Sequence, residues 1–176
     1  VDMATKLHEQ FKPYIRDRQV GRLHVVGSND DTAGLIDASY RRFLLALENH
    51  LVAQPFMLGY RPGASDFGIY GQLTQLIGFD PTPRAIAHEL APRVVAWTGL
   101  LEDQSGLEPE ESDWITGRNI PSSLSELLKE VGRVYAPALL ANAKALQSGE
   151  KTWEAEIDGG LWNQQTFSYQ GKCLQW

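Results

Sequence analysis

The sequence has little of the residue types that form the commonest catalytic and metal sites. A single cysteine, Cys173, among 176 residues allows no intramolecular disulfide. The four histidines are dispersed, and no pair has the i, i+4 spacing of metal ligands on a helix, so no metal site is predicted. Neither a Gly-x-Ser-x-Gly elbow nor a Cys/His pairing is visible, so the sequence predicts no catalytic residue.

Clusters of basic residues and long apolar runs are also missing. The formal net charge is −6, and without a basic stripe neither nucleic acid nor an anionic membrane surface is an expected partner. No secretory signal pattern and no apolar run of membrane-spanning length occur, which favours a cytoplasmic location. The chain begins at Val1 and stops at Trp176 within an apolar helical pattern, so we expect a piece of a longer protein.

Apolar residues at helical spacing dominate the sequence. Hydrophobic residues make up 43% of the chain, which is enough to form the core of one domain. Residues 2–19 predict an amphipathic helix that packs one face against the core and is kinked or split at Pro13. After a connection over 21–34, residues 34–53 match the helical pattern most closely.

The most specific local signal lies in residues 61–73, which define the start of a helix. Gly63 is the expected N-cap, because Pro62 before it cannot extend a helix backward. Asp66 then falls at N3, where its carboxylate can accept from the N-cap backbone N–H and face the positive end of the helix dipole. Since residues 64–77 are apolar nearly all round, we expect a buried helix, with Asp66 serving structure and not catalysis.

Capping and proline signals mark the helices that follow. Thr82 is the expected cap of a short helix, and Pro92 opens another. Residues 105–121 are rich in acidic residues and predict a surface loop. The S-x-x-E sequence at 123–126 is a complete capping box, so a helix is expected from residue 124.

The period changes from helical to alternating at residues 152–162. Apolar residues alternate with glutamates from Trp153 to Ile157, and an Asp-Gly-Gly turn follows, which predicts a small β-hairpin. Because an isolated hairpin is marginally stable in water, it is expected to pack against helices. Residues 164–176 return to helical spacing and predict a terminal helix.

The helix start at 61–73 resembles that of the core helix in the C-terminal domain of glutathione S-transferases. The family usually has Ser or Thr where Gly63 stands, so only the Asp66 half of its capping box is kept here. Three other segments are similar to the family's preceding helix, its connection into the core helix and its next helix: Tyr40–Glu48, Pro55–Gly59 and Pro92–Trp97.

This resemblance implies an all-α fold in two parts. Residues 1–104 would form a helical bundle like the family's C-terminal domain. Residues 105–176 would form an extension seen in some bacterial relatives and packed on the bundle. It would contain a loop, the helix from 124, one small hairpin near 152–162 and the terminal helix.

The resemblance also implies a function. In the family, an N-terminal thioredoxin-like domain binds and activates the cosubstrate glutathione, while the C-terminal domain forms the hydrophobic wall of the electrophile pocket. No thioredoxin-like pattern is recognisable here, so this fragment is expected to be inactive alone. Its implied partners are that missing domain and, in the full-length protein, a second copy. By position, Phe11, Tyr14, Ile15 and Arg18 would line the electrophile pocket, and plain core packing is the alternative for Phe11 and Ile15.

A noncatalytic interaction module is the alternative function. Domains of this type also occur in translation factors, aminoacyl-tRNA synthetase complexes and scaffold proteins. The acidic charge weakens any version of this alternative that binds tRNA.

Overall fold

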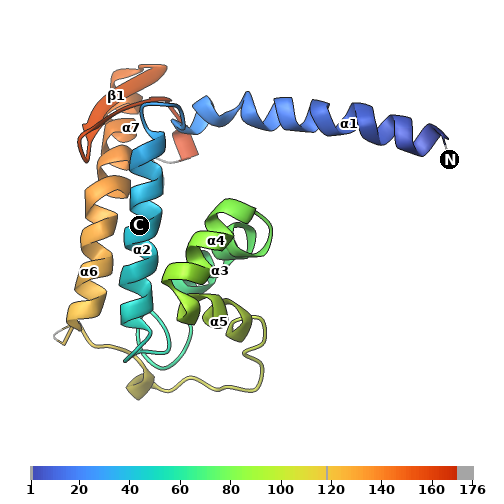
Figure 1. Ribbon diagram of the computed structural model, residues 1–176. Helices are drawn as coiled ribbons and strands as arrows, with labels where there is room; N and C mark the ends of the chain where they lie inside the picture. The colour runs from blue at the N-terminus through green and yellow to red at the C-terminus, as the bar shows by residue number, and fades with distance from the viewer. Residues whose placement is uncertain (1, 118, 170–176) are drawn as a thin grey trace. The chain divides into compact units, whose positions relative to one another are not determined.

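The computed structural model describes residues 2–117 and 119–169, with side chains from residue 7 onward (Figure 1). The described chain is mostly helical and has one small antiparallel hairpin, which confirms both of these expectations. No helix in this part of the chain is both long and apolar enough to cross a membrane. The chain forms two compact units: residues 38–132 make up one, and the residues before and after this range make up the other.

These units divide the chain differently from the expected boundary at 104/105. Helix α6 (Ser122–Glu130) falls in the predicted extension, yet its Leu124 and Leu127 are buried in the same core as Leu73 of the predicted bundle. The segment after residue 104 therefore completes the bundle, because the core needs these two leucines.

The bundle unit is built from helices α2 to α6. In chain order the helices are α2 (Ala33–His50), which enters the unit at Ala38, α3 (Ala64–Gly78), α4 (Pro81–Leu90), α5 (Pro92–Leu100), the short 3-10 helix η2 (Glu111–Asp113) and α6. Its core contains Leu44, Leu47, Leu73 and Val94, each at most 1% exposed. Apolar residues at helical spacing on every helix of the unit meet in this one core.

Helix α3 buries only one face, so the prediction of a helix buried all round is wrong. Asp66, Leu73 and Ile77 are buried, whereas Phe67 on another face is 48% exposed. Helix α3 therefore has more apolar residues than it buries against the rest of its unit.

Two helices begin at residues other than those predicted. At α4 the N-cap is Asp80 and not Thr82, because the Asp80 carboxylate accepts from the Thr82 backbone N–H at 3.2 Å. Helix α6 starts at Ser122 after an N-cap, Pro121, that makes no side-chain cap hydrogen bond. The predicted capping box at 123–126 is therefore wrong, and the Ser123 hydroxyl has a different partner, described below.

The connection between α2 and α3 is tied to the loop before α6. The Tyr60 N–H donates to the Asp113 carbonyl at 2.8 Å, and the Ile115 N–H donates to the Leu58 carbonyl at 2.7 Å. Gly59 lies between these bonds with a φ of 135°, a region open to glycine but rarely to other residues. The loop expected at the surface is thus held to the bundle by backbone pairing.

The second unit contains the two ends of the described chain. Its elements are α1 (Asp2–Val20), the 3-10 helix η1 (Leu23–Val26), the start of α2, most of the π-helical segment η3 (Val131–Tyr135), α7 (Ala136–Ser148), β1 (Thr152–Ile157) and β2 (Gly160–Gln165). Helix α1 is continuous through Pro13, so the predicted split does not occur. Strand β2 occupies 164–165, where a terminal helix was expected, and residues 170–176 of that expected helix lie outside the described residues.

The hairpin is longer than predicted and packs as expected. Its two-residue turn, Asp158 and Gly159, has φ values of 48° and 79°, as a type I′ turn requires. Trp153 and Ile157 on one face form a small core with Ala145 of α7. Packing against α7 therefore stabilises a sheet of only two strands.

Gly59 gives a test of the backbone pairing around it. A Cβ at this position would lie 2.0 Å from the Asp113 carbonyl oxygen, so we expect Gly59→Ala to lower the free energy of unfolding by about 2 kcal/mol or more. Gly71→Ala is the matched control: nothing lies within 4 Å of its Cβ, so it should stabilise α3 by about 0.5–1 kcal/mol. Urea denaturation of both variants measures the difference, and equal effects would contradict the steric argument.

Tyr40 gives a test at alkaline pH. Burial raises the pKa of this phenol above its ordinary value of 10.0, and the negative charge of Asp80 raises that pKa further. Because the pKa of Tyr40 is higher in the folded state than in the unfolded state, the contribution of this group to stability is fully present below its unfolded pKa. This contribution is lost as the pH rises through its folded pKa. At neutral pH Tyr40→Phe should cost about 1 kcal/mol, because it removes the hydrogen bond to the Pro83 carbonyl. In denaturation experiments, the difference in the free energy of unfolding between the unsubstituted chain and Tyr40→Phe should narrow above about pH 10. A difference that stays constant with pH would contradict the raised pKa of Tyr40.

Candidate functional site

The Asp66 carboxylate binds two backbone N–H groups from different segments. Gly63 is the N-cap of α3, and its N–H donates to Asp66 Oδ2 at 2.9 Å. The Met57 N–H donates to Asp66 Oδ1 at 2.8 Å, and Asp66 is 0% exposed. Both oxygens are therefore engaged by backbone donors. This arrangement fixes the start of α3 and gives no sign of a general base.

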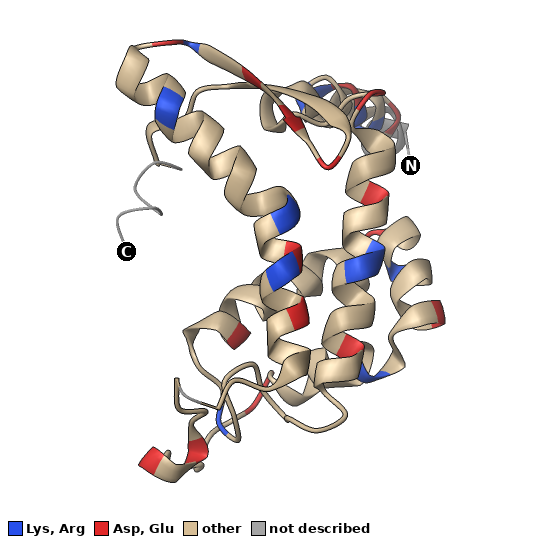
Figure 2. Ribbon diagram, turned by 90° about the vertical axis from the view of Figure 1, so that its left-hand side faces the viewer, with Lys and Arg blue, Asp and Glu red and all other residues tan. Residues whose placement is uncertain are grey.

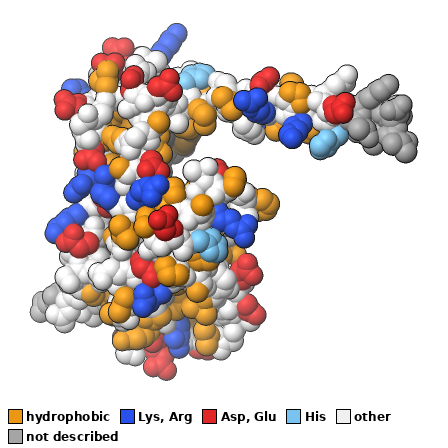
Figure 3. Space-filling view, in the orientation of Figure 1, with side chains coloured by type: hydrophobic (Ala, Val, Ile, Leu, Met, Phe, Trp, Pro, Cys, Tyr) orange, Lys and Arg blue, Asp and Glu red, His pale blue; other side chains and the backbone are white. Residues whose placement is uncertain are grey.

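The four predicted pocket residues lie on α1, where they are largely exposed. Phe11 and Tyr14 are 58% and 61% exposed, Arg18 is exposed, and Ile15 is partly buried. Figure 3 shows hydrophobic and charged side chains side by side on the surface of this helix. The two rings lie side by side, with centroids 6.3 Å apart and planes tilted by 34°. None of these four residues belongs to the two cores described above, and both roles considered for this face, pocket wall and core packing, stay predictions.

His50 is fully buried and joins three segments. Its Nε2 lies 3.1 Å from the Phe56 carbonyl oxygen, which can only accept, so Nε2 carries the proton. In the singly protonated ring, Nδ1 then accepts from the Ser123 hydroxyl, 2.9 Å away. A serine bonded to a histidine is also found in hydrolases, but this histidine is 0% exposed and has a backbone carbonyl where a hydrolase triad has a carboxylate. The three groups therefore connect α2, the connection after it and the start of α6.

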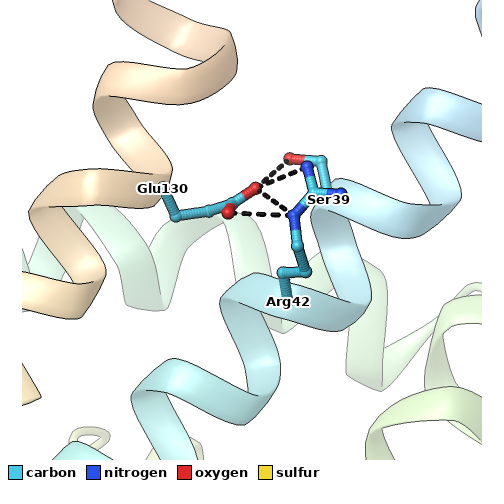
Figure 4. A network of polar contacts seen from close by, with 3 residues as sticks. All are labelled: Ser39, Arg42 and Glu130. Atoms are coloured by element: carbon cyan, nitrogen blue, oxygen red, sulfur yellow. Dashed lines mark hydrogen bonds and ion pairs between the residues drawn. The ribbon is translucent and has the colours of Figure 1, made fainter. Parts of the chain in front are cut away.

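A second polar network connects α2 to the end of α6 (Figure 4). Arg42 Nε lies 2.9 Å from each Glu130 carboxylate oxygen, and Arg42 Nη2 lies 2.8 Å from Oε1. Ser39 Oγ donates to the same Oε1 at 3.3 Å. The Glu130 side chain is 11% exposed and the Arg42 side chain 30%, so the carboxylate is the better shielded partner of this bidentate pair. This network fixes the packing of two helices and leaves no reactive group exposed.

Glu48 caps helix α5 from a distance. The N-cap residue, Ala91, has no polar side chain, and Glu48 Oε2 instead accepts from the N–H groups of Arg93 and Val94 at 2.9 and 3.1 Å. Its other oxygen lies 2.9 Å from Arg93 Nη1. The carboxylate thus satisfies free donors at a positive helix end.

A hollow of about 410 Å³ lies beside α5. The Trp97 indole lines it, while its Nε1 donates to the Pro55 carbonyl at 2.9 Å. Arg93, already paired with Glu48, is the charged residue of its lining. The hollow is otherwise lined by the apolar residues Leu51, Pro55, Ala96 and Leu100. It offers an apolar surface and no catalytic group.

The described residues offer no metal centre. No group of three or more potential ligands comes together in this part of the chain. His8, His24 and His88 are exposed on three separate elements, whereas His50 is engaged as described above.

No protein-family model matches the chain, and neither a curated protein nor a solved structure matches it. The resemblance to glutathione S-transferases therefore depends on residues 61–73 and the segments around them.

Two aspartates at helix starts test the structural role of Asp66. Asp66→Ala leaves two N–H groups without their acceptor in a buried setting, so we expect a loss of about 2–4 kcal/mol in the free energy of unfolding. Asp80→Ala removes an exposed cap with one acceptor bond and should cost only about 1 kcal/mol. Chemical denaturation compares the two variants, and an unchanged midpoint for Asp66→Ala would refute the cap.

Proposed function

We propose that this chain is the C-terminal helical domain of a glutathione S-transferase-like protein and supplies the hydrophobic wall of its electrophile pocket. The observation that carries the proposal is the buried Asp66 carboxylate, bonded to the N–H groups of Met57 and Gly63. These bonds join the core helix to the connection before it, in the order in which both segments resemble the family. The proposal includes a cytoplasmic parent protein.

The exposed face of α1 supports the second half of the proposal. Phe11 and Tyr14 are exposed apolar rings with the partly buried Ile15 beside them, and Arg18 lies one turn further along. In the proposed parent this surface faces the glutathione-binding thioredoxin-like domain. A largely apolar wall of this kind holds an electrophile mainly by burial and shape, and its polar groups are the Tyr14 hydroxyl and the Arg18 guanidinium.

Chemistry in the proposed parent belongs to the other domain. Asp66 has both oxygens engaged, and His50 is buried with both ring nitrogens engaged. Neither group can activate a thiol without breaking its bonds. The described chain alone is therefore proposed to be inactive, with glutathione as the cosubstrate of the parent.

The alternative is a noncatalytic interaction module, and the same exposed face of α1 favours it as well. The two functions differ in what the parent protein contains. A thioredoxin-like domain with a Ser, Tyr or Cys near its first strand supports the enzyme, and conjugation of glutathione by the parent separates the two directly.

The test uses the parent protein and 1-chloro-2,4-dinitrobenzene as the electrophile. Phe11→Ala should raise the KM for this electrophile about tenfold and leave the KM for glutathione unchanged, because it removes apolar surface from the wall. Phe79→Ala is the matched control, since Phe79 is 78% exposed on a different segment and should alter neither constant. Conjugation by the 176-residue chain alone would overturn the division of labour between domains.

A further inference from the structure

A hollow of about 330 Å³ runs along one edge of the hairpin. Lys144 and Ser148 of α7 lie on one side of it, and the consecutive residues 152–155 of β1 lie on the other. Because side chains alternate between the faces of a strand, a hollow lined by consecutive residues follows the strand's edge. Since a water molecule occupies about 30 Å³, there is room for amino-acid side chains.

The register of the hairpin shows which backbone groups face this edge. The Thr166 N–H donates to the Lys151 carbonyl at 2.9 Å, so alternate pairs from there exchange hydrogen bonds across the hairpin. These pairs are Trp153↔Gln164, Ala155↔Trp162 and Ile157↔Gly160. The N–H and C=O groups of Thr152, Glu154 and Glu156 therefore point outward, and none has a backbone partner among the described residues.

The outer edge of β1 thus has the features of an acceptor for another strand. It offers unpaired backbone groups at every second residue, and a sheet of two strands gains stability from a third. Trp153 lines the hollow and is 7% exposed, and its Nε1 has no hydrogen-bond partner among the described residues. The edge and the hollow lie on the same strand, so one extended segment could use both.

Charge determines what kind of segment fits. Glu154 and Glu156 are exposed on the face of β1 that points away from α7, and Glu150 lies at the hollow. Figure 2 shows acidic positions following one another along the hairpin. A second copy paired through the same edge would bring these glutamates against each other, which is unfavourable across strands. A segment with basic residues on that face would instead place opposite charges side by side.

We propose that the outer edge of β1 binds an extended segment of another protein, in which Lys or Arg alternates with apolar residues. The segment adds a third strand through the outward groups of Thr152, Glu154 and Glu156. Its basic side chains lie beside the glutamates, and its apolar side chains enter the hollow next to Trp153. The backbone hydrogen bonds fix the register of the bound segment, and the glutamates select for basic side chains in it.

The experiment uses the full 176-residue chain and a blocked seven-residue peptide of alternating Lys and Val with a fluorescent label. Fluorescence anisotropy should show saturable binding, and NMR hydrogen exchange should show protection of the amides of Thr152, Glu154 and Glu156. A peptide with Glu in place of Lys should bind at least about tenfold more weakly, since like charges then face each other.

Proline substitutions separate the edge from the rest of the hairpin. Glu154→Pro removes a backbone N–H from the free edge of β1 and leaves the hydrogen-bonded pairs Trp153↔Gln164 and Ala155↔Trp162 intact. It should therefore weaken peptide binding about tenfold or more. Asn163→Pro is the matched control, because Asn163 is the cross-strand partner of Glu154 and its N–H points outward from the opposite edge. This control should leave binding unchanged. Glu154→Gln keeps the N–H and removes the charge, so it should lower affinity most at low salt.

Three results would overturn the proposal. The first is a lack of binding of the Lys/Val peptide to the folded, unsubstituted 176-residue chain. The second is equal weakening by Glu154→Pro and Asn163→Pro, which would place the peptide elsewhere. The third is a concentration-dependent dimer of the chain that Glu154→Pro abolishes, which would assign the edge to a second copy.

Discussion

The bundle depends on a carboxylate that holds two buried backbone donors from different segments. Asp66 receives the N–H groups of Gly63 and Met57, so the start of α3 and the connection before it must form together. Other side chains hold the same connection at its carbonyls: Trp97 donates to Pro55, and the His50 ring donates to Phe56. The connection has backbone bonds of its own between Phe56 and Gly59, and these side chains satisfy further buried backbone groups.

How far the sequence could predict this structure depends on whether each interaction is local. Asp66 and Gly63 are three residues apart, so the cap was visible as a pattern. The second donor, Met57, was not visible, because nothing in the pattern shows which distant N–H will lie beside a carboxylate. Glu48 escaped prediction for the same reason, since it caps α5 from a residue 45 positions away. Sequence patterns thus identify where a helix can start, and tertiary structure decides which group satisfies the start.

The S-x-x-E sequence before α6 shows how a local pattern can mislead. Ser123 has the right neighbours for a capping box, but its hydroxyl lies 2.9 Å from His50 Nδ1, and the helix starts at Ser122, two residues earlier than predicted. A buried histidine nitrogen must have a partner, so this tertiary bond outweighs a cap that water could also provide. The hairpin was predictable because its turn and alternation are local, whereas periodicity in α1 showed an apolar face without showing what covers it.

The exposed face of α1 and the outer edge of β1 differ in the kind of specificity they can provide. The α1 face is apolar, and burial of apolar surface is non-directional, so it favours any partner of complementary shape. The β1 edge offers backbone donors and acceptors at fixed spacing, where a shift of one residue exchanges inward and outward side chains. With glutamates on its outward face, a slipped register would also misplace the opposite charges. The first surface suits the broad electrophile pocket that we propose, and the second suits recognition of a defined peptide sequence.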